Sequence, residues 1–279
     1  MSVAARVVIA LGVLALLAAG FATPAGRHAL RVVRYEWIGG QPLVWSVPRV
    51  TVDCTTPPPD FVALTFGQSN AANTVQGRHA ARDGVVWFHE GRCYAAADPL
   101  PGATGTGGSV WSRLGDRLLD SGRYRRVLFA GVAENGSELA RWEPGGDLHA
   151  RLSAALAALR VAGLTPTHLL WHQGEQDMRL GTAPERYRDG FRALVDAIRA
   201  QGVAAPVFVA RATYCNGDDS PLLRAAQQAL IEPARGIYAG PDTDGLRGPA
   251  WRRDDCHFTA AGAERHAELW RDALLAATP

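Results

Sequence analysis

Short apolar runs alternate with longer amphipathic stretches along the chain from residue 61 to its C-terminal end. The short runs favour β-strands, and we predict four of them: Phe61–Phe66, Arg126–Val132, His168–Trp171 and Pro206–Ala212. The longer stretches predict five helices: Val110–Leu119, Leu148–Val161, Pro184–Arg199, Pro221–Ile231 and Ala260–Ala276. Apolar strands that alternate with helices are typical of a parallel sheet covered on both faces. The sequence therefore predicts a three-layer α/β/α, flavodoxin-like sandwich with about five parallel strands.

The N-terminus is a separate apolar segment. Arg6 precedes an apolar run from Val7 to Phe21, which has the length of a secretory h-region and is marginal for spanning a bilayer. Residues 1–25 are therefore expected to be either a signal peptide or an N-terminal membrane anchor; a buried core helix is the less favoured alternative. Residues 26–59 are predicted to be a linker and lead-in, and residues 60–279 a single domain. We expect that domain outside the cytoplasm, periplasmic or secreted.

Charge and cysteine content narrow the possible partners. The formal net charge is +2 and the arginines are scattered, so no nucleic-acid partner is expected. No protein partner is implied, and the membrane is expected to be contacted only through the N-terminal segment. The four cysteines (Cys54, Cys93, Cys215 and Cys256) suit an exported protein and allow three disulfide pairings. None of them has zinc-site spacing, and we expect neither a metal nor another cofactor.

Candidate chemistry follows the predicted strands, where parallel α/β sheets bind their ligands. The first strand leads into Gly67-Gln68-Ser69-Asn70, in which the glycine permits a sharp turn that presents the serine at the sheet edge. Alone, such a Ser-Asn pair is more often a turn or a helix cap. The second strand is followed by Ala133–Ser137. Gly136 in this segment either offers its backbone N–H to a pocket or is an ordinary loop glycine.

The third predicted strand ends in the densest polar cluster of the chain, residues 171–177. The side-chain amide of Gln173 is a candidate donor to an oxyanion, whereas His172 and Glu175 are too few ligands for a metal. Before the last helix, Asp254 stands three residues ahead of His257. A carboxylate at that spacing can fix the tautomer of the imidazole and leave its other nitrogen free to accept a serine proton. The alternative is a histidine that merely lies at a helix start.

Taken together and in order, these four blocks resemble the SGNH (GDSL-like) hydrolases. Within that group, they are most similar to the sialate O-acetylesterase-like branch, which includes acetylxylan esterases of carbohydrate esterase family six. The resemblance is carried by Gly67–Asn70, Gly136-Ser137, Trp171–Asp177 and Asp254–His257, and it covers residues 60–275. The chain departs from the pattern at His172, where the family often has tyrosine.

The resemblance implies a role for each matching residue. Ser69 looks like the nucleophile, His257 its general base and Asp254 the group that orients the base. Asp255 remains an alternative to Asp254. The implied oxyanion hole combines the backbone N–H groups of Ser69 and Gly136 with the side chain of Gln173. The remaining motif residues are expected to support the loops: Gln68, Asn70, Glu175 and Asp177.

With these roles, the predicted topology favours one disulfide pairing. Cys215 follows the fourth strand and Cys256 precedes the base, so both are expected at the same rim of the sheet and are paired with each other. Cys54 and Cys93 then form the second bridge. Three tryptophans, Trp87, Trp111 and Trp142, are candidates for a carbohydrate platform, and packing in the core is the alternative for each.

The expected reaction is the removal of an O-acetyl group from an acetylated carbohydrate through an acyl-enzyme on serine. One alternative is an SGNH esterase or lipase that acts on a non-sugar ester. The other is a carbohydrate-binding envelope protein that has lost turnover. The full set of serine, histidine, aspartate and glutamine favours an enzyme.

Overall fold

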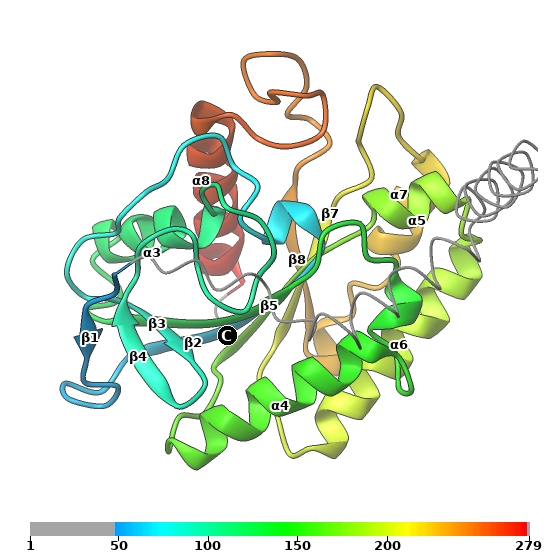
Figure 1. Cartoon of the computed structure of the whole chain (residues 1–279). Coiled ribbons are helices and arrows are strands. Elements are labelled where there is room, and N and C mark those ends of the chain that lie inside the picture. The colour runs from blue at the N-terminus through cyan, green and yellow to red at the C-terminus, as the bar shows by residue number, and fades with distance from the viewer. Residues whose placement is uncertain (1–47, 278–279) are drawn as a thin grey trace, which may run out of the picture. The chain divides into compact units, whose positions relative to one another are not determined.

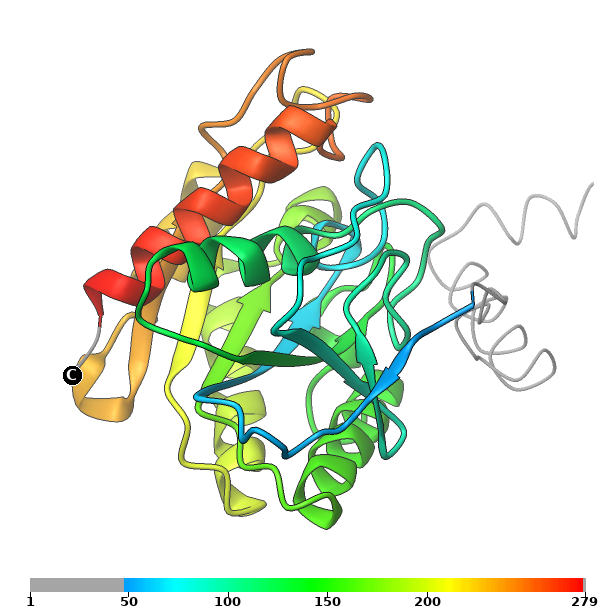
Figure 2. The same cartoon turned by 90° about the vertical axis from the view of Figure 1, so that its left-hand side faces the viewer.

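An eight-stranded sheet forms the centre of the structure, a computed structural model that describes residues 48–277 (Figures 1 and 2). Its strands are β1 (Thr51–Val52), β2 (Phe61–Gly67), β3 (Val85–His89), β4 (Arg92–Ala95), β5 (Val127–Ala133), β6 (His168–His172), β7 (Val207–Arg211) and β8 (Ile237–Asp242). Their order across the sheet is β1-β4-β3-β5-β2-β6-β7-β8. The pairings from β3 to β8 in this order are all parallel, whereas β4 is antiparallel to both of its neighbours.

Helices cover both faces of this sheet. They are α3 (Val110–Asp120), α4 (Asp147–Val161), α5 (Glu175–Leu180), α6 (Pro184–Ala200), α7 (Pro221–Gln228) and α8 (Ala260–Ala276). Buried residues of α4, α6 and α7 pack with Val62, Leu64 and Phe66 of β2. Those of α3 and α8 pack with Phe61 and Ala63 of the same strand. Because successive strand residues point to opposite faces, β2 is apolar on both sides. The predicted α/β/α sandwich is confirmed.

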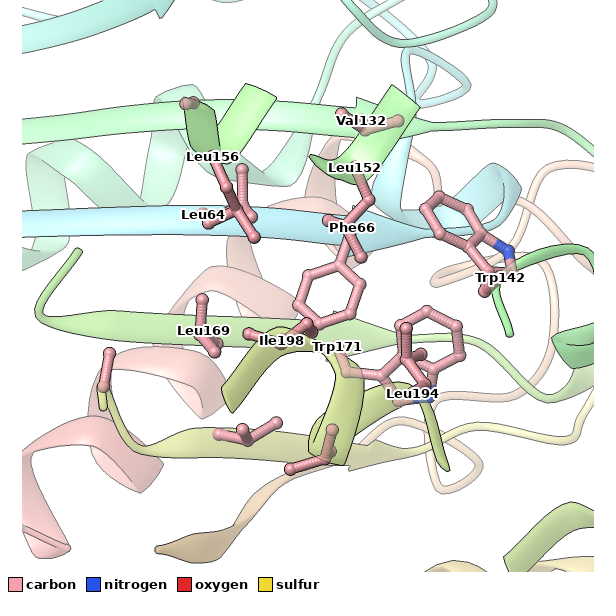
Figure 3. Packing of buried hydrophobic residues seen from close by; sticks show 14 of the residues in the cluster. Leu64, Phe66, Val132, Trp142, Leu152, Leu156, Leu169, Trp171, Leu194 and Ile198 are labelled. Atoms are coloured by element: carbon pink, nitrogen blue, oxygen red, sulfur yellow. The ribbon is translucent and has the colours of Figure 1, made fainter. Parts of the chain in front are cut away.

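The core on the α4 and α6 side is built from branched and aromatic side chains (Figure 3). Leu152 and Leu156 of α4 lie over Leu64 and Phe66 of the central strand. Side chains of α6 cover the neighbouring strand β6 in the same way. Full burial of one such side chain contributes about 1.5–3 kcal/mol, so this layer holds the central strands rigidly beneath the site.

All five predicted helices are present, and the four predicted strands are β2, β5, β6 and β7. The prediction missed the hairpin of β3 and β4, in which Glu90 and Gly91 both have positive φ. A two-residue turn of this kind leaves little sequence signal when the first residue is a glutamate. It also missed β8, whose Gly240-Pro241 dipeptide is typical of a loop.

Of the two possibilities left open for the three tryptophans, packing in the core is the one observed, and the carbohydrate platform is wrong. Trp87, Trp111 and Trp142 are each at most 1% exposed. Their indole N–H groups donate to Pro101 O, Ala71 O and Ser137 Oγ respectively. A buried tryptophan with a satisfied N–H is a core residue, so these rings stabilise the loops from within and present no face to a sugar.

The last residues of the lead-in belong to the sheet. β1 pairs with β4, and the Cys54–Cys93 disulfide joins the two segments, as the sequence predicted. Arg49 adds a hydrogen bond to Ala97 O. The predicted signal or anchor at residues 1–25 lies outside the described residues. None of the helices in the described part of the chain has the length and apolarity that a bilayer crossing needs.

Candidate active site

Three parallel strands end at the same level and bring three sequence blocks together. Gly67, the last residue of β2, pairs with Ala133 of β5 on one side and with His172 of β6 on the other. The segments 68–70, 134–137 and 173–177 therefore leave the sheet side by side. This is the sheet edge at which the sequence placed the chemistry.

Two glycines allow the backbones to approach closely at this edge. A Cβ at Gly67 would lie 2.0 Å from His172 O, and a Cβ at Gly174 would lie 2.0 Å from Ala212 O. Both residues also have positive φ, +141° and +155°, which side-chain-bearing residues rarely adopt. The close approach lets Gln68 N donate to His172 O at 3.0 Å. Glycine is thus required by space and by conformation at both positions.

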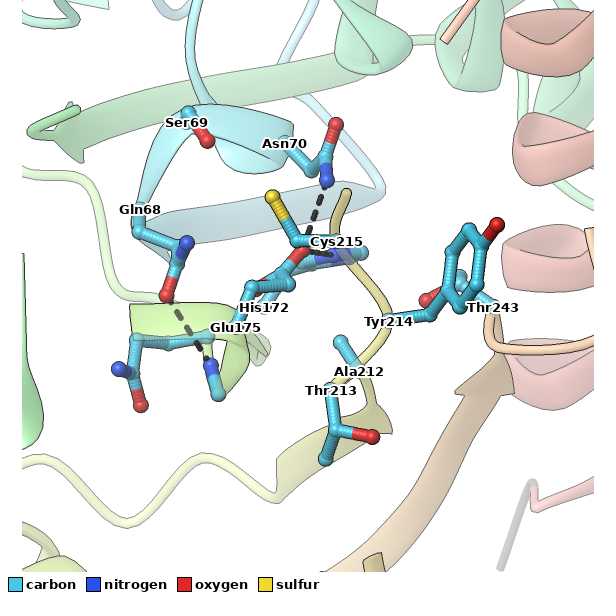
Figure 4. Close-up of polar contacts among 12 residues, drawn as sticks. Gln68, Ser69, Asn70, His172, Glu175, Ala212, Thr213, Tyr214, Cys215 and Thr243 are labelled. Atoms are coloured by element: carbon cyan, nitrogen blue, oxygen red, sulfur yellow. Dashed lines mark hydrogen bonds and ion pairs between the residues drawn. The ribbon is translucent and has the colours of Figure 1, made fainter. Parts of the chain in front are cut away.

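Ser69 begins a short 3-10 turn (Ser69–Ala71) directly after β2. The Thr74 hydroxyl donates to Ser69 O at 2.7 Å and fixes the turn. The side chain of Gln68 adds a second restraint, because its Oε1 accepts from Gly174 N and Gln176 N. Figure 4 shows Gln68 and Ser69 next to each other on this turn. Neither the Nε2 of Gln68 nor the N–H of Ser69 donates a hydrogen bond within residues 48–277.

His257 and Asp254 form a hydrogen-bonded pair on the segment before α8. His257 Nδ1 lies 2.8 Å from Asp254 Oδ2, and His257 N donates to Asp254 Oδ1 at 2.6 Å. Burial acts to raise the pKa of Asp254, but the hydrogen bonds from His257 outweigh it and the pKa is lowered below 3.8. Asp254 is therefore a carboxylate near neutral pH. A quarter of the His257 side chain is exposed, and its Nε2 is not used by the pair.

The two adjacent aspartates have different partners. Asp255 accepts a hydrogen bond from the Tyr214 hydroxyl and has a positive φ of 56°. Of the two residues that the sequence left open, Asp254 is the one in contact with His257.

Contacts on both sides of His257 join its segment to the Ser69 turn. Asn70 Nδ2 donates to Cys256 O at 3.3 Å, and Gln76 N donates to Phe258 O at 3.0 Å. The Cys215–Cys256 disulfide has the predicted pairing and ties the segment to the loop after β7. No hydrogen bond joins Ser69 Oγ to His257 among the described residues. Catalytic hydrogen bonds of serine enzymes are often long or poorly aligned before substrate binds, so this absence does not rule out the pair.

The side chain of Gln173, the predicted oxyanion donor, is directed into the protein interior. Its side chain is fully buried, and its amide nitrogen donates to Ser137 O at 3.1 Å and to Asp177 Oδ2 at 2.5 Å. An amide has two N–H donors, so both are used. The bond to Ser137 O instead fixes the loop that contains Gly136, whose φ is +63°. Sequence gives the residue type at this position but not the direction of the amide.

Asp177, Glu175 and Asn70 form hydrogen bonds with the loops around the site. Asp177 accepts from Leu139 N and from the Thr182 hydroxyl. Glu175 is buried and accepts from Asn70 Nδ2 at 2.7 Å. Burial acts to raise the pKa of Glu175, but the hydrogen bonds from the His172 ring and from Asn70 Nδ2 offset it and hold the pKa below 4.5.

Sequence reasoning missed two residues that hold the His257 segment, Tyr214 and Arg252. Tyr214 precedes Cys215 and binds Asp255. Arg252 is buried; it donates to Thr243 O at 2.8 Å and also to Cys256 O. Neither residue belongs to a recognisable motif, and an arginine is usually expected at the protein surface.

Comparison with known families identifies the chain. Residues 62–276 match the family described as "carbohydrate esterase, sialic acid-specific acetylesterase". The chain belongs to this family. The carbohydrate esterase is accordingly a carboxylic ester hydrolase, and its reaction class is the removal of O-acetyl groups from carbohydrate, as expected from the sequence.

Solved structures support the fold of the esterase. A protein from Arabidopsis thaliana has a TM-score of 0.62 and 19% identity, covering 79% of this chain and 99% of its own. A carbohydrate acetylesterase from Xanthomonas citri has a TM-score of 0.54 and 19% identity, with coverage of 76% and 55%. The protein named NanS has a TM-score of 0.52 and 17% identity, with coverage of 78% and 98%. No curated protein matches in sequence. At these identities the likeness concerns the fold alone.

Proposed function

We propose that this esterase deacetylates a carbohydrate with Ser69 as nucleophile, His257 as general base and Asp254 as the group that orients the base. The observation that carries the proposal is the His257–Asp254 pair, 2.8 Å between Nδ1 and Oδ2, on a segment bonded to the Ser69 turn. Asp254 binds the Nδ1 proton, so Nε2 is the nitrogen that accepts the proton of Ser69 Oγ. The serine then attacks the acetyl carbonyl and releases the sugar hydroxyl, and water hydrolyses the acetyl-enzyme.

The tetrahedral intermediate needs hydrogen-bond donors, and Gln173 supplies none. We assign the hole to the N–H groups of Ser69 and Gly136 and to Nε2 of Gln68. Gln68 suits this role because Gly174 N and Gln176 N bind its Oε1. These two bonds fix the orientation of the amide, so its nitrogen is the atom left on the other side. A donor that is oriented in advance is the arrangement that stabilises a developing oxyanion.

The compartment is also part of the proposal. Both disulfides occur in a domain of ordinary size with a large apolar core, and structural disulfides persist in oxidising compartments. An extracytoplasmic location, periplasmic or secreted, follows from that chemistry. Whether residues 1–25 are cleaved or remain as an anchor is decided by mass spectrometry of the exported protein.

The nucleophile is tested with the full-length protein, p-nitrophenyl acetate and an organophosphonate that labels active serines. We expect Ser69→Ala to lower kcat by more than about 10³-fold and to abolish labelling of the peptide that contains residue 69. Ser112→Ala is the matched control, since this buried serine of α3 binds Asp98 Oδ1 and its loss leaves the label in place. Unchanged turnover in Ser69→Ala would end the assignment.

The substrate class needs a second measurement. Acetate release is compared for O-acetylated sialic acid, acetylated xylan and a long-chain ester. We expect an acetylated sugar to have the highest kcat/KM. Preference for the long-chain ester points to a lipase-like enzyme, and binding without release of acetate points to a carbohydrate-binding protein.

A further inference from the structure

A cluster of buried polar side chains lies directly behind the Ser69 turn. It consists of residues from four elements that are distant in sequence: Asn70, His172, Glu175, His266 and Trp270. Each of them is at most 1% exposed. We call these residues the His172–His266 cluster. Figure 4 shows its first three members next to Gln68 and Ser69.

Direct contacts connect this cluster to the site. Glu175 Oε1 accepts from Asn70 Nδ2 at 2.7 Å and lies 3.3 Å from His172 Nε2. The rings of His172 and His266 meet edge to face, with 4.8 Å between centroids. The ring of His266 also contacts Phe258, the residue after the base, at 4.7 Å. The cluster therefore extends from α8 to both catalytic loops.

Six buried atoms of the cluster have no hydrogen-bond partner among residues 48–277. They are Asn70 Oδ1, Glu175 Oε2, His172 Nδ1, both ring nitrogens of His266, and Trp270 Nε1. Burying a polar group without a partner costs roughly 1–3 kcal/mol. Native proteins rarely retain such atoms in one place unless something binds them.

The balance of donors and acceptors identifies what binds there. A neutral His172 that donates from Nε2 has an acceptor at Nδ1, and Asn70 Oδ1 and Glu175 Oε2 are acceptors as well. Neutral His266 offers one donor and one acceptor, and Trp270 offers one donor. Acceptors thus outnumber donors by four to two in this cluster. The missing partner must itself bring donors.

Water meets this requirement better than any ion. A water molecule brings two O–H donors, and buried waters typically make about three hydrogen bonds. An anion would add acceptors next to the Glu175 carboxylate. Within the described residues, no group of three His, Cys, Asp or Glu side chains is arranged to hold a metal ion. The nearby cation Arg252 is already committed to the carbonyls of Leu246, Cys256 and Thr243.

We propose that the His172–His266 cluster is a built water-binding site, and that His266 is a positioning residue that acts through this water on Glu175. Glu175 orients Asn70, and Asn70 holds Cys256 O next to the base. Helix α8 thereby sets the position of His257 relative to Ser69. The effect on catalysis rests on the function proposed above for Ser69 and His257, whereas the water site does not.

The water site is tested by a crystal structure of the protein at a resolution that shows ordered solvent. We expect water within hydrogen-bonding distance of Glu175 Oε2 and of a ring nitrogen of His266. Direct pairing of these two side chains, or density of a bound ion between them, overturns the proposal. This outcome is independent of whether the enzyme is active.

The positioning role is tested by two substitutions at one residue. His266→Leu removes both nitrogens, and we expect kcat to fall about tenfold with KM unchanged, because small displacements of a catalytic group are costly. His266→Gln retains a donor and an acceptor and is expected to recover most of that loss. Thermal unfolding of both variants measures the structural contribution separately.

Three results would overturn the positioning role. They are a wild-type kcat in His266→Leu, equal losses in the leucine and glutamine variants, and a loss explained entirely by a smaller folded fraction. Labelling of residue 69 by the organophosphonate keeps the two proposals apart. If wild-type Ser69 is not labelled, the proposed function fails, while the water in the crystal structure still decides the site.

Discussion

At the residue scale, the role of each side chain in the site depends on which of its polar atoms are already hydrogen-bonded within the protein. Ser69, His257 and Asp254 were predicted from residue type and spacing, and the structure joins their loops. Gln173 was predicted in the same way, yet its amide points into the core. The spacing of Trp171–Asp177 places a glutamine at the strand end. The direction of its side chain depends on Ser137 and Tyr187, which are distant in sequence.

Two isosteric substitutions distinguish the two glutamines. Gln68→Glu retains the oxygen that Gly174 N and Gln176 N bind but removes the N–H donors. We expect kcat on p-nitrophenyl acetate to fall about 10²–10³-fold with little change in KM, as for the loss of an oxyanion donor. Gln173→Glu is the matched control; it places a carboxylate beside Asp177 and should lower the free energy of unfolding. If Gln173→Glu lowers kcat and Gln68→Glu does not, Gln173 rather than Gln68 is the oxyanion donor.

At the element scale, strongly patterned segments were predictable and weakly patterned ones were not. The five long helices and four central strands have clear apolar periodicity, and the structure contains them all. The short helix α5 was missed because Glu175–Leu180 is mostly polar. One face of the helix is fixed by hydrogen bonds, from Gln176 N to Gln68 Oε1 and from Leu139 N to Asp177 Oδ2, rather than by apolar packing. Such contacts between loops are absent from any local pattern.

The two disulfides allow a comparison between a site loop and a distant edge. Their cysteines are 39 and 41 residues apart, so each loop closure should stabilise the fold by a similar amount, about 4 kcal/mol. Only Cys215–Cys256 holds the residue next to His257. We expect the Cys215→Ser/Cys256→Ser double variant to lose about tenfold in kcat at a temperature where it is still folded.

The Cys54→Ser/Cys93→Ser double variant is the control for that experiment. Its bridge joins the segment after β1 to β4 at one edge of the sheet, so the variant should lose comparable stability in urea unfolding but retain kcat. Equal losses of kcat in both double variants would show that the bridge at Cys256 has no specific effect on the base.

At the scale of the whole molecule, the layered fold followed from sequence because apolar strands and helices alternate along the chain. The placement of polar groups inside the core did not. The fully buried His266 and the partly buried His168 are examples, since a histidine in a helix or strand is usually expected at the surface. Burial lowers the pKa of His266 well below 6.5 and that of His168 to about 4, with the positive charge of Arg123 assisting at His168.

These buried histidines make the stability of the whole domain depend on pH. Below pH 6.5 the unfolded chain takes up a proton at residue 168, whereas the folded protein does so only near pH 4. The unfolded state binds more protons in this window, so the free energy of unfolding decreases as pH falls through it. For His168 alone the loss from neutral pH to its folded pKa amounts to about 3 kcal/mol.

His168→Phe retains the stacking on Phe61, 4.3 Å between ring centroids, and removes the titration. Urea unfolding of both proteins at pH 7 and at pH 4 should therefore show a smaller pH-dependent loss in the variant by about this amount. The carboxylates titrate alike in the two proteins and cancel in the comparison, so equal losses would mean that folding does not lower the pKa of His168.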